Sequence, residues 1–332
     1  MKSVGGLFEN ITSLPLLDRA TQTAAKGKRH RTSVQRFLAD APDQLARLRA
    51  ELRDETYRPR PYHQFRICDP KPRLISCADF RDRVVHHAVC SQLAPVIERR
   101  LIDDTYACRC GKGSHRAVLR AQEFCRRYAF YLKTDIRRYY DSVHHTTLEE
   151  LLGCLFRERS VKRLLSTIIR HPLPGQLPER GLPIGNLTSQ WFGNLYLDDA
   201  DHWIKEVCRA PGYVRYMDDL VVWSDSKAWL WALADDLQDY SRTIRSLTLK
   251  SERTIVAPSS VGVPFLGYRV FPGLIRHQGG RARRRRRLLW QREQAYQRGD
   301  LTAEQLTACV RSMNGSRQFL HAGERLRSEM EI

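Results

Sequence analysis

The sequence lacks a hydrophobic run long enough to cross a membrane. No stretch of about 18 consecutive apolar residues occurs in it. Its first residues, MKSVGGLFE, also lack the apolar centre of a secretory signal peptide. We therefore expect a cytoplasmic protein without a membrane partner.

Paired cysteines are missing as well. The nine cysteines are an odd number, and none forms a Cys-X-X-Cys pair. This pattern argues against a disulfide framework and against a structural zinc site. The histidine pairs His86–His87 and His144–His145 are adjacent and lack the i,i+4 spacing of ligands on a helix. We expect them to be core or surface residues.

Acidic residues are few relative to basic ones. The chain has 37 Asp and Glu against 56 Lys and Arg, a formal net charge of +19. Such an excess favours polyanions, and nucleic acid is the preferred partner because no basic amphipathic membrane anchor stands out. The run Arg283 to Arg287 is expected to contact a phosphate backbone. A solvated helix face or a targeting signal is the alternative.

Composition and periodicity divide the chain into three parts. We expect an N-terminal helical extension over 1–60, a mixed unit over 61–274 and a basic helical segment over 275–332. Helices are predicted at 43–53, 80–100, 147–169 and 226–245 and from 281 onward. Strands are predicted at 65–68, 73–76, 128–135, 248–256 and 264–271, with a hairpin at 213–223.

Two adjacent carboxylates lie at the predicted turn of the 213–223 hairpin. Apolar and aromatic residues flank Asp218 and Asp219 on both sides. Adjacent acids at a turn need a cation or water, and Mg²⁺ takes one or two carboxylates plus substrate phosphates. An ordinary Asp-containing turn is the alternative, because Asp favours turns.

A third acid, Asp135, ends the strand predicted at 128–135. If this strand lies beside the hairpin, three carboxylates meet, which is the arrangement for nucleotidyl transfer assisted by two metal ions. The transition state gathers negative charge, so cations should face the acids. Lys71 and Arg73, on the predicted 65–76 hairpin, are the candidates. Mg²⁺ is the expected ion, and Mn²⁺ is also compatible.

An aromatic residue after Asp135 would pack under the sugar of an incoming nucleotide. Tyr140 has this position, and its ring would leave no room for a 2′-hydroxyl. Deoxynucleotides would then be selected. The alternative for Tyr139 and Tyr140 is core packing, and we expect one of the two to be a core residue.

Five motifs, taken in order along the chain, resemble those of reverse transcriptases. The resemblance rests on a YxDD box (Tyr216 to Asp219), a first catalytic motif (Asp135 to Tyr140), fingers motifs (Lys71 to Arg73 and Asp82 to Val85), a further block (Arg109 to His115) and a primer-grip hairpin (Phe265 to Tyr268). It implies an α+β right-hand polymerase fold with fingers, a palm whose antiparallel sheet is backed by helices, and a helical thumb.

The resemblance also implies roles for individual residues. Asp135, Asp218 and Asp219 would be catalytic, and together with Ile136 they would bind the metal ions. The primer grip would be Phe265, Leu266, Gly267 and Tyr268. The nucleotide-binding residues would be Lys71, Arg73, Ile136, Tyr140, Ile184, Gly185 and Gln190.

The segment from Leu182 to Gln190 points to a subgroup. Most reverse transcriptases have Gln-Gly-xxx-Ser-Pro here, whereas this chain has Ile184 for the glutamine and Gln190 for the proline. This form resembles the enzymes of diversity-generating retroelements, which copy a template-repeat RNA into cDNA mutated at adenines. The implied partners are template RNA, the RNA–cDNA duplex, dNTPs and a small basic helical accessory protein.

Other interpretations remain open. A group II intron- or retron-like reverse transcriptase is one, although we expect the short stretch after Tyr268 to hold a thumb and no maturase, endonuclease or RNase H domain. A non-catalytic RNA-binding scaffold is another, and the intact aspartates argue against it. The sequence also has Arg253 where many relatives have a lysine that protonates pyrophosphate, with Lys250 as a weak substitute.

Overall fold

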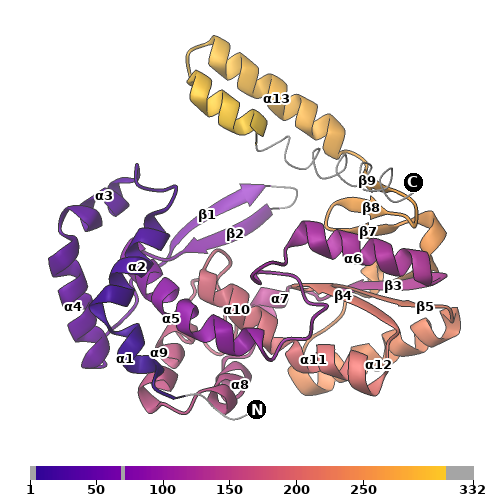
Figure 1. Ribbon diagram of the computed structural model, residues 1–332, viewed down its shortest axis with the longest axis horizontal. Coiled ribbons are helices and arrows are strands. Elements are labelled where there is room, and N and C mark those ends of the chain that lie inside the picture. The colour runs from indigo at the N-terminus through magenta and orange to yellow at the C-terminus, as the bar shows by residue number, and fades with distance from the viewer. Residues whose placement is uncertain (1–4, 69–71, 312–332) are drawn as a thin grey trace, which may run out of the picture.

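The computed structural model describes residues 5–68 and 72–311. Within these ranges the strands form three antiparallel sheets, surrounded by helices (Figure 1). This agrees with the expected α+β fold, in which an antiparallel palm sheet is backed by helices. No helix of the described residues is long and apolar enough to span a bilayer.

Four N-terminal helices precede the long helix α5 (Phe80–Glu98); the first three pack against it, and the fourth packs against the second and third. They are α1 (Leu7–Ile11), α2 (Leu14–Ala25), α3 (Thr32–Ala39) and α4 (Ala41–Arg53). Leu17, Leu48 and Val84 are fully buried in the core that these helices share with the rest of the chain. The N-terminal extension therefore shares one core with the elements that follow it.

The expected hairpin over residues 65–76 is confirmed. Strands β1 (His63–Cys68) and β2 (Pro72–Cys77) pair antiparallel and form a two-stranded sheet. Most of its residues are exposed, including Phe65 and Leu74. The tip of the hairpin, with Lys71, lies outside the described residues.

The palm sheet has four strands in the order β4-β5-β3-β6. These are β4 (Gly212–Tyr216), β5 (Asp219–Ser224), β3 (Phe130–Asp135) and β6 (Ile255–Pro258). Side chains alternate between its faces. Leu132 packs in the core with α12 (Lys227–Arg245), whereas Tyr131 faces α6 (Ser114–Arg127) and the third sheet.

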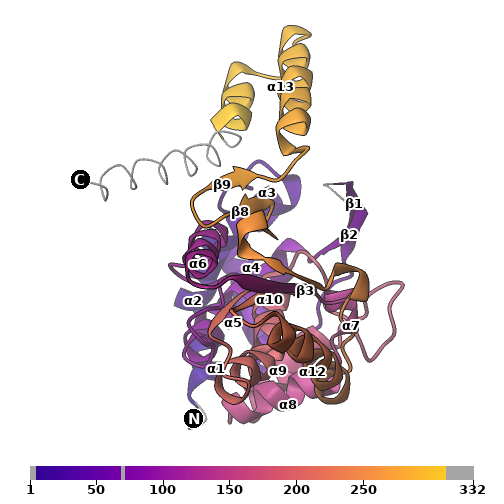
Figure 2. The same ribbon diagram turned by 90° about the vertical axis from the view of Figure 1, so that its right-hand side faces the viewer.

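The third sheet has the order β7-β8-β9 and lies above the palm sheet beside α6 (Figure 1). Its strands are β7 (Val263–Phe265), β8 (Tyr268–Val270) and β9 (Ile275–His277). Helix α13 (Arg281–Gln297) follows and projects away from the body in both views (Figures 1 and 2).

The remaining elements fill the palm and the region that joins it to the N-terminal helices. They are α7 (Tyr139–Ser142), α8 (His145–Leu155), α9 (Arg159–Ile169), α10 (Leu187–Tyr196), α11 (Asp198–His202), the π-helix η1 (Trp203–Val207) and the 3-10 helices η2 (Ser251–Arg253) and η3 (Ser259–Val261).

Two predictions of secondary structure were wrong in detail. The single helix expected over 147–169 is divided into α8 and α9, with Phe156 fully buried at the break and Glu158 accepting a hydrogen bond from the Phe8 N–H at 2.9 Å. In the strand expected over 248–256, Leu249 forms an isolated bridge with Ile136, residues 251–253 form the 3-10 helix η2, and the last two residues belong to β6. Long-range contacts override the local pattern at both places.

Candidate active site

The palm sheet brings the predicted aspartates together. Strand β3 pairs antiparallel with β5 so that Asp135 lies directly opposite Asp219. Side chains at paired positions project from the same face of a sheet. Asp218 follows at the β4–β5 turn, next to Met217, whose φ of 57° is left-handed. The expectation that the 130s strand lies beside the hairpin is therefore confirmed.

The carboxylates repel one another in a partly buried environment. Burial, together with the charges of Asp135 and Asp219, raises the pKa of Asp218 to about 6. Burial also raises the pKa of Asp219, while the neighbouring Lys133 ammonium lowers it. The site thus holds more negative charge than its own side chains balance, as expected for a cation-binding site.

Two lysines neutralise part of this charge: Lys133, which sequence reasoning did not identify, and Lys250, which it named only as a weak substitute for a proton donor. Lys133 forms an ion pair with Asp219. The Nζ of Lys250 lies 2.8 Å from Oδ1 of Asp135, and its backbone N–H donates to the Asp135 carbonyl at 2.8 Å. A signal for Lys133 was available, since it precedes Asp135 by two residues and so shares its face of the strand.

The donor set fits hard divalent cations. Asp135, Asp218 and Asp219 offer the carboxylate oxygens that Mg²⁺ prefers. In the described part of the chain, however, no three His, Cys, Asp or Glu side chains gather closely enough to hold a metal ion. Asp135 and Asp219 are turned toward lysines, so binding an ion requires these carboxylates to reorient.

The side chain of Ile136 cannot bind a metal ion or a nucleotide. The side chain is 1% exposed and packs in the main core. Only the backbone carbonyl of Ile136 is therefore available as a ligand for a metal ion or a nucleotide.

The predicted primer-grip residues contact the same acids. The turn between β7 and β8 has left-handed φ values at Leu266 (48°) and Gly267 (79°), as a type I′ hairpin requires. The Leu266 backbone N–H lies near the Asp219 carboxylate and lowers its pKa, opposing the effect of burial. The Nζ of Lys133 lies 5.7 Å from the centroid of the Phe265 ring, and Tyr268 stacks on His277. The turn therefore borders the acids directly.

The two tyrosines after Asp135 have different environments. Tyr139 is 2% exposed, and its hydroxyl donates to the Gly193 carbonyl. It is the core residue of the pair. Tyr140 is half-buried, and its pKa is raised by burial and by the nearby charge of Asp218. The charge of Asp218 also raises the pKa of Tyr139, so the two tyrosines differ in exposure, and Tyr140 is the more accessible one.

The Ile184–Gly185 segment lies against the base of the β1–β2 hairpin. The Ser76 N–H donates to the Ile184 carbonyl at 2.9 Å. Gly185 has a φ of 117°, and a Cβ built there would lie 2.8 Å from Cγ2 of Ile75. A side chain at Gly185 would thus separate the segment from β2. Gln190 is half-buried in α10.

Arg73 and Arg253, which sequence reasoning considered as cations of the site, make no ion pair with the three aspartates in the described part of the chain. Arg73 is exposed on β2. Arg253 is exposed in η2, whereas Lys250 reaches Asp135. The structure therefore places Lys250, and not Arg253, beside the carboxylates.

A buried ion pair supports the β4–β5 turn from behind. Arg215 is 1% exposed, and its Nε donates to Oδ1 of Asp201 at 2.7 Å. Its Nη1 donates to the Met217 carbonyl at 3.0 Å, and its Nη2 donates to the Asn194 carbonyl at 3.2 Å. Sequence reasoning did not identify this arginine, although a charged residue within an apolar strand suggests a buried partner.

Part of the chain is similar in sequence to a known protein. Group II intron-encoded protein LtrA of Lactococcus lactis subsp. cremoris is 21% identical over 175 residues, which are 50% of this chain and 29% of that protein. The chain thus spans less than a third of this curated relative.

Solved telomerase structures also align with the chain. A telomerase from Candida tropicalis truncated from its C-terminal domain has a TM-score of 0.48 and 13% identity, covering 65% of this chain and 55% of that one. Telomerase from Candida albicans, in complex with a fragment of telomeric RNA, also has a TM-score of 0.48 and 13% identity, covering 68% and 48%.

The profile of one protein family matches more than half of the chain. That family is described as reverse transcriptase (RNA-dependent DNA polymerase), and the match runs over residues 68–270. It includes Asp135, the β4–β5 hairpin and the β7–β8 turn. The chain belongs to the reverse transcriptase family.

Proposed function

We propose that this chain is an RNA-directed DNA polymerase that extends a primer by nucleotidyl transfer assisted by two Mg²⁺ ions. The observation that carries the proposal is the pairing of Asp135 with Asp219 across β3 and β5, with Asp218 at the adjoining turn. In the reaction, the primer 3′-oxygen attacks the α-phosphorus of a dNTP and pyrophosphate leaves.

Each part of the site has a role in this reaction. Asp135, Asp218, Asp219 and the Ile136 carbonyl would hold the ions. When bound, such ions lower the pKa of the attacking hydroxyl and balance the charge of the triphosphate. Lys133 and Lys250 would release Asp219 and Asp135 and remain as cations near the developing negative charge.

The substrates would be positioned by elements around the acids. Arg73 and Lys71, on the β1–β2 hairpin, would bind the triphosphate, and Tyr140 would pack under the deoxyribose. The Ile184–Gly185 segment and Gln190 would border the base pair being formed. The turn of Phe265 to Tyr268, which lies near Asp219 at Leu266, would hold the primer end.

Primer extension tests this proposal. With a primed RNA template, dNTPs and Mg²⁺, the wild-type chain should make cDNA, and Asp218→Asn should reduce the rate by at least about 10³-fold. Asp235→Asn is the matched control, since Asp235 is exposed on α12, and it should retain full activity. A wild-type chain that extends no primer with any template or metal ion would favour a non-catalytic RNA-binding role.

We further propose that the enzyme serves a diversity-generating retroelement. Ile184 and Gln190 support this assignment, and it implies adenine-directed errors and a small basic helical accessory protein as partner. A template-repeat RNA would be copied into mutated cDNA for mutagenic retrohoming. An imperfect repeat that lies near the gene and differs at adenines would support this role, and its absence would count against it.

A group II intron-like role is the second candidate, because the match to LtrA favours it. The two candidates differ in error pattern. An intron-type enzyme should copy template adenines as accurately as the other bases, so sequencing of cDNA made in vitro distinguishes them.

A further inference from the structure

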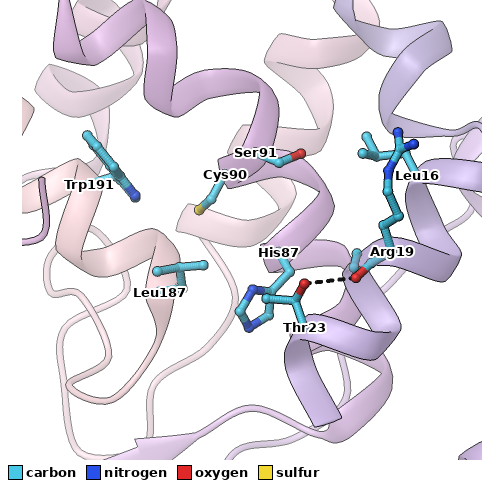
Figure 3. Close-up of a pocket in the computed structure, with 9 residues that line it drawn as sticks. Leu16, Arg19, Thr23, His87, Cys90, Ser91, Leu187 and Trp191 are labelled. Carbon is cyan, nitrogen blue, oxygen red and sulfur yellow. Dashed lines mark hydrogen bonds between the residues drawn. The ribbon is translucent and has the colours of Figure 1, made fainter. Parts of the chain in front are cut away.

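A cavity of about 390 Å³ lies between α2, α5 and α10 (Figure 3). None of the residues proposed above for catalysis or for binding dNTP lines it. Its lining consists of Leu16, Arg19, Ala20 and Thr23 from α2, His87, Cys90 and Ser91 from α5, and Leu187 and Trp191 from α10. It is therefore distinct from the carboxylate site.

The cavity has an apolar interior and a polar opening. Ala20, Cys90 and Trp191 are at least 92% buried, whereas Arg19 and Ser91 are exposed. Figure 3 shows the Trp191 indole and the His87 imidazole on the walls of the cavity. A flat, partly aromatic ligand can thus enter from the surface and lie against rings, and the volume is in the lower range for small-ligand pockets.

Cationic side chains gather beside the cavity. Arg83 precedes His87 by one turn of α5, and its Nη2 donates to the Ala24 carbonyl at the end of α2, at 3.3 Å. Burial lowers the pKa of His87, and Arg83 and Lys28 lower it further. Burial also lowers the pKa of Lys28, with Arg83 and Arg31 adding to the effect. These groups repel one another, which an anion would relieve.

We propose that this cavity binds one unpaired nucleotide of the RNA template, with its base against His87 and Trp191 and its phosphate at Lys28 and Arg83. This inference rests on the proposed function, because it takes the RNA to be the template. Protein aromatic and histidine rings stack on unpaired RNA bases, and Lys and Arg contact the backbone phosphates. The cavity with its cationic edge combines both features.

The position of α10 links this cavity to the nucleotide site. Leu187 begins α10 immediately after the Ile184–Gly185–Asn186 segment, and Asn186 accepts a hydrogen bond from the Ala78 N–H at 3.2 Å. A template base held against Leu187 and Trp191 would therefore be fixed relative to the segment that borders the new base pair. We expect the bound nucleotide to lie in the single-stranded template ahead of the primer end.

A fluorescent template tests the proposal without requiring catalysis. The probe is a primed RNA that carries 2-aminopurine at one position of its single-stranded overhang, mixed with the wild-type chain without dNTPs. One overhang position should show a change in fluorescence at least about twofold larger than its neighbours, because stacking and burial are local. Equal changes at every position would overturn the proposal.

Cavity-filling variants provide the second arm. Ala20→Leu adds bulk to the interior, and Ser91→Leu adds it at the exposed mouth, where folding is not at risk. Both should abolish the position-specific signal while general RNA binding persists. A signal unchanged in Ser91→Leu would overturn the proposal, because the RNA base would then be held elsewhere on the chain.

Charge variants provide the third arm. Lys28→Glu should weaken binding of the overhang RNA by about 10-fold at low salt, because one phosphate contact is lost. Lys26→Glu is the matched control, since Lys26 is exposed in the same turn and should change affinity less. Equal effects of the two variants would overturn the phosphate assignment. A wild-type chain that shows the local signal but extends no primer would contradict only the proposed function.

Discussion

Two antiparallel hairpins carry the charges proposed for catalysis, and their environments differ. The β4–β5 hairpin lies in the palm sheet, with Tyr213 and Val222 fully buried. The β1–β2 hairpin pairs with no third strand in the described part of the chain, and Arg73 is exposed. The backbone that carries the acids is thus fixed by the palm sheet, whereas the backbone that carries Arg73 has no such support.

This difference has a physical basis. Buried strands, the β3 partner and the Arg215–Asp201 pair fix the acidic turn from several sides. A two-stranded hairpin alone is only marginally stable in water. We infer that the palm fixes the backbone positions of the acids, and that the β1–β2 hairpin gains its geometry from contact with the triphosphate.

The largest expected effect is on the buried support of the acidic turn. Arg215→Met leaves Asp201 buried without its cation, which should lower the free energy of unfolding by about 3–5 kcal/mol. Urea denaturation measures this. Adding Asp201→Asn should restore part of the loss, and Arg73→Met should change stability by less than about 0.5 kcal/mol. Equal losses for Arg215→Met and Arg73→Met would remove the contrast between the hairpins.

The second prediction concerns pH. The pKa of Asp218 is raised from 3.8 to about 6, so the carboxyl becomes protonated as the pH falls through about 6. Activity should then decrease about tenfold per pH unit. A higher Mg²⁺ concentration should shift this decrease in activity to lower pH, because the ion binds only the ionised carboxylate. If the pH at which activity decreases did not depend on the Mg²⁺ concentration, the assignment of Asp218 as a metal ligand would be contradicted.

The same shift has a consequence for stability. Between pH 4 and 6 the folded chain binds more protons at Asp218 than the unfolded chain does. The stability of the wild-type chain, relative to Asp218→Asn, should therefore fall as the pH rises through this range. Urea denaturation at several pH values checks the sign, and a relative stability that rises with pH would exclude the raised pKa.

A smaller effect is expected at the exposed hairpin. Arg73→Ala should raise the KM for dNTP by about tenfold, because one charge-assisted contact worth roughly 1.4 kcal/mol is lost. The free energy of unfolding should change little. Steady-state extension with varied dNTP measures the KM. Arg66→Ala, also exposed but on β1, is the control and should leave KM nearly unchanged. A change in kcat alone would argue against contact with the bound triphosphate.

The smallest effect is expected at Ile184. Ile184→Gln should reduce misincorporation opposite template adenine by roughly tenfold or less, because a polar contact to the base pair adds about 1 kcal/mol of discrimination. Sequencing of cDNA gives the error rate, with template cytosine as the internal control. No improvement at adenine would count against the role of Ile184 in fidelity.

The local pattern of the chain was sufficient for some of this structure. The hairpin around Asp218, the strand that ends at Asp135 and the helix that became α5 all followed from apolar periodicity and turn residues. The roles given to Lys71, Tyr140 and Gln190 remain predictions, and Lys71 lies outside the described residues.

Other features needed the tertiary structure. Lys133 and Lys250 were not expected to cover the acids, and nothing in the sequence near Arg215 identifies Asp201 as its partner.

Short-range spacing determines which face of an element a side chain occupies. The amino-acid sequence by itself therefore determined that Asp135 ends a strand and that Asp218 and Asp219 lie at a turn. The register between distant strands and the packing of separate helices determine which side chains meet across elements. For this reason only the tertiary structure decided the lysine contacts of the acids, the buried support of the turn and the cavity between α2, α5 and α10.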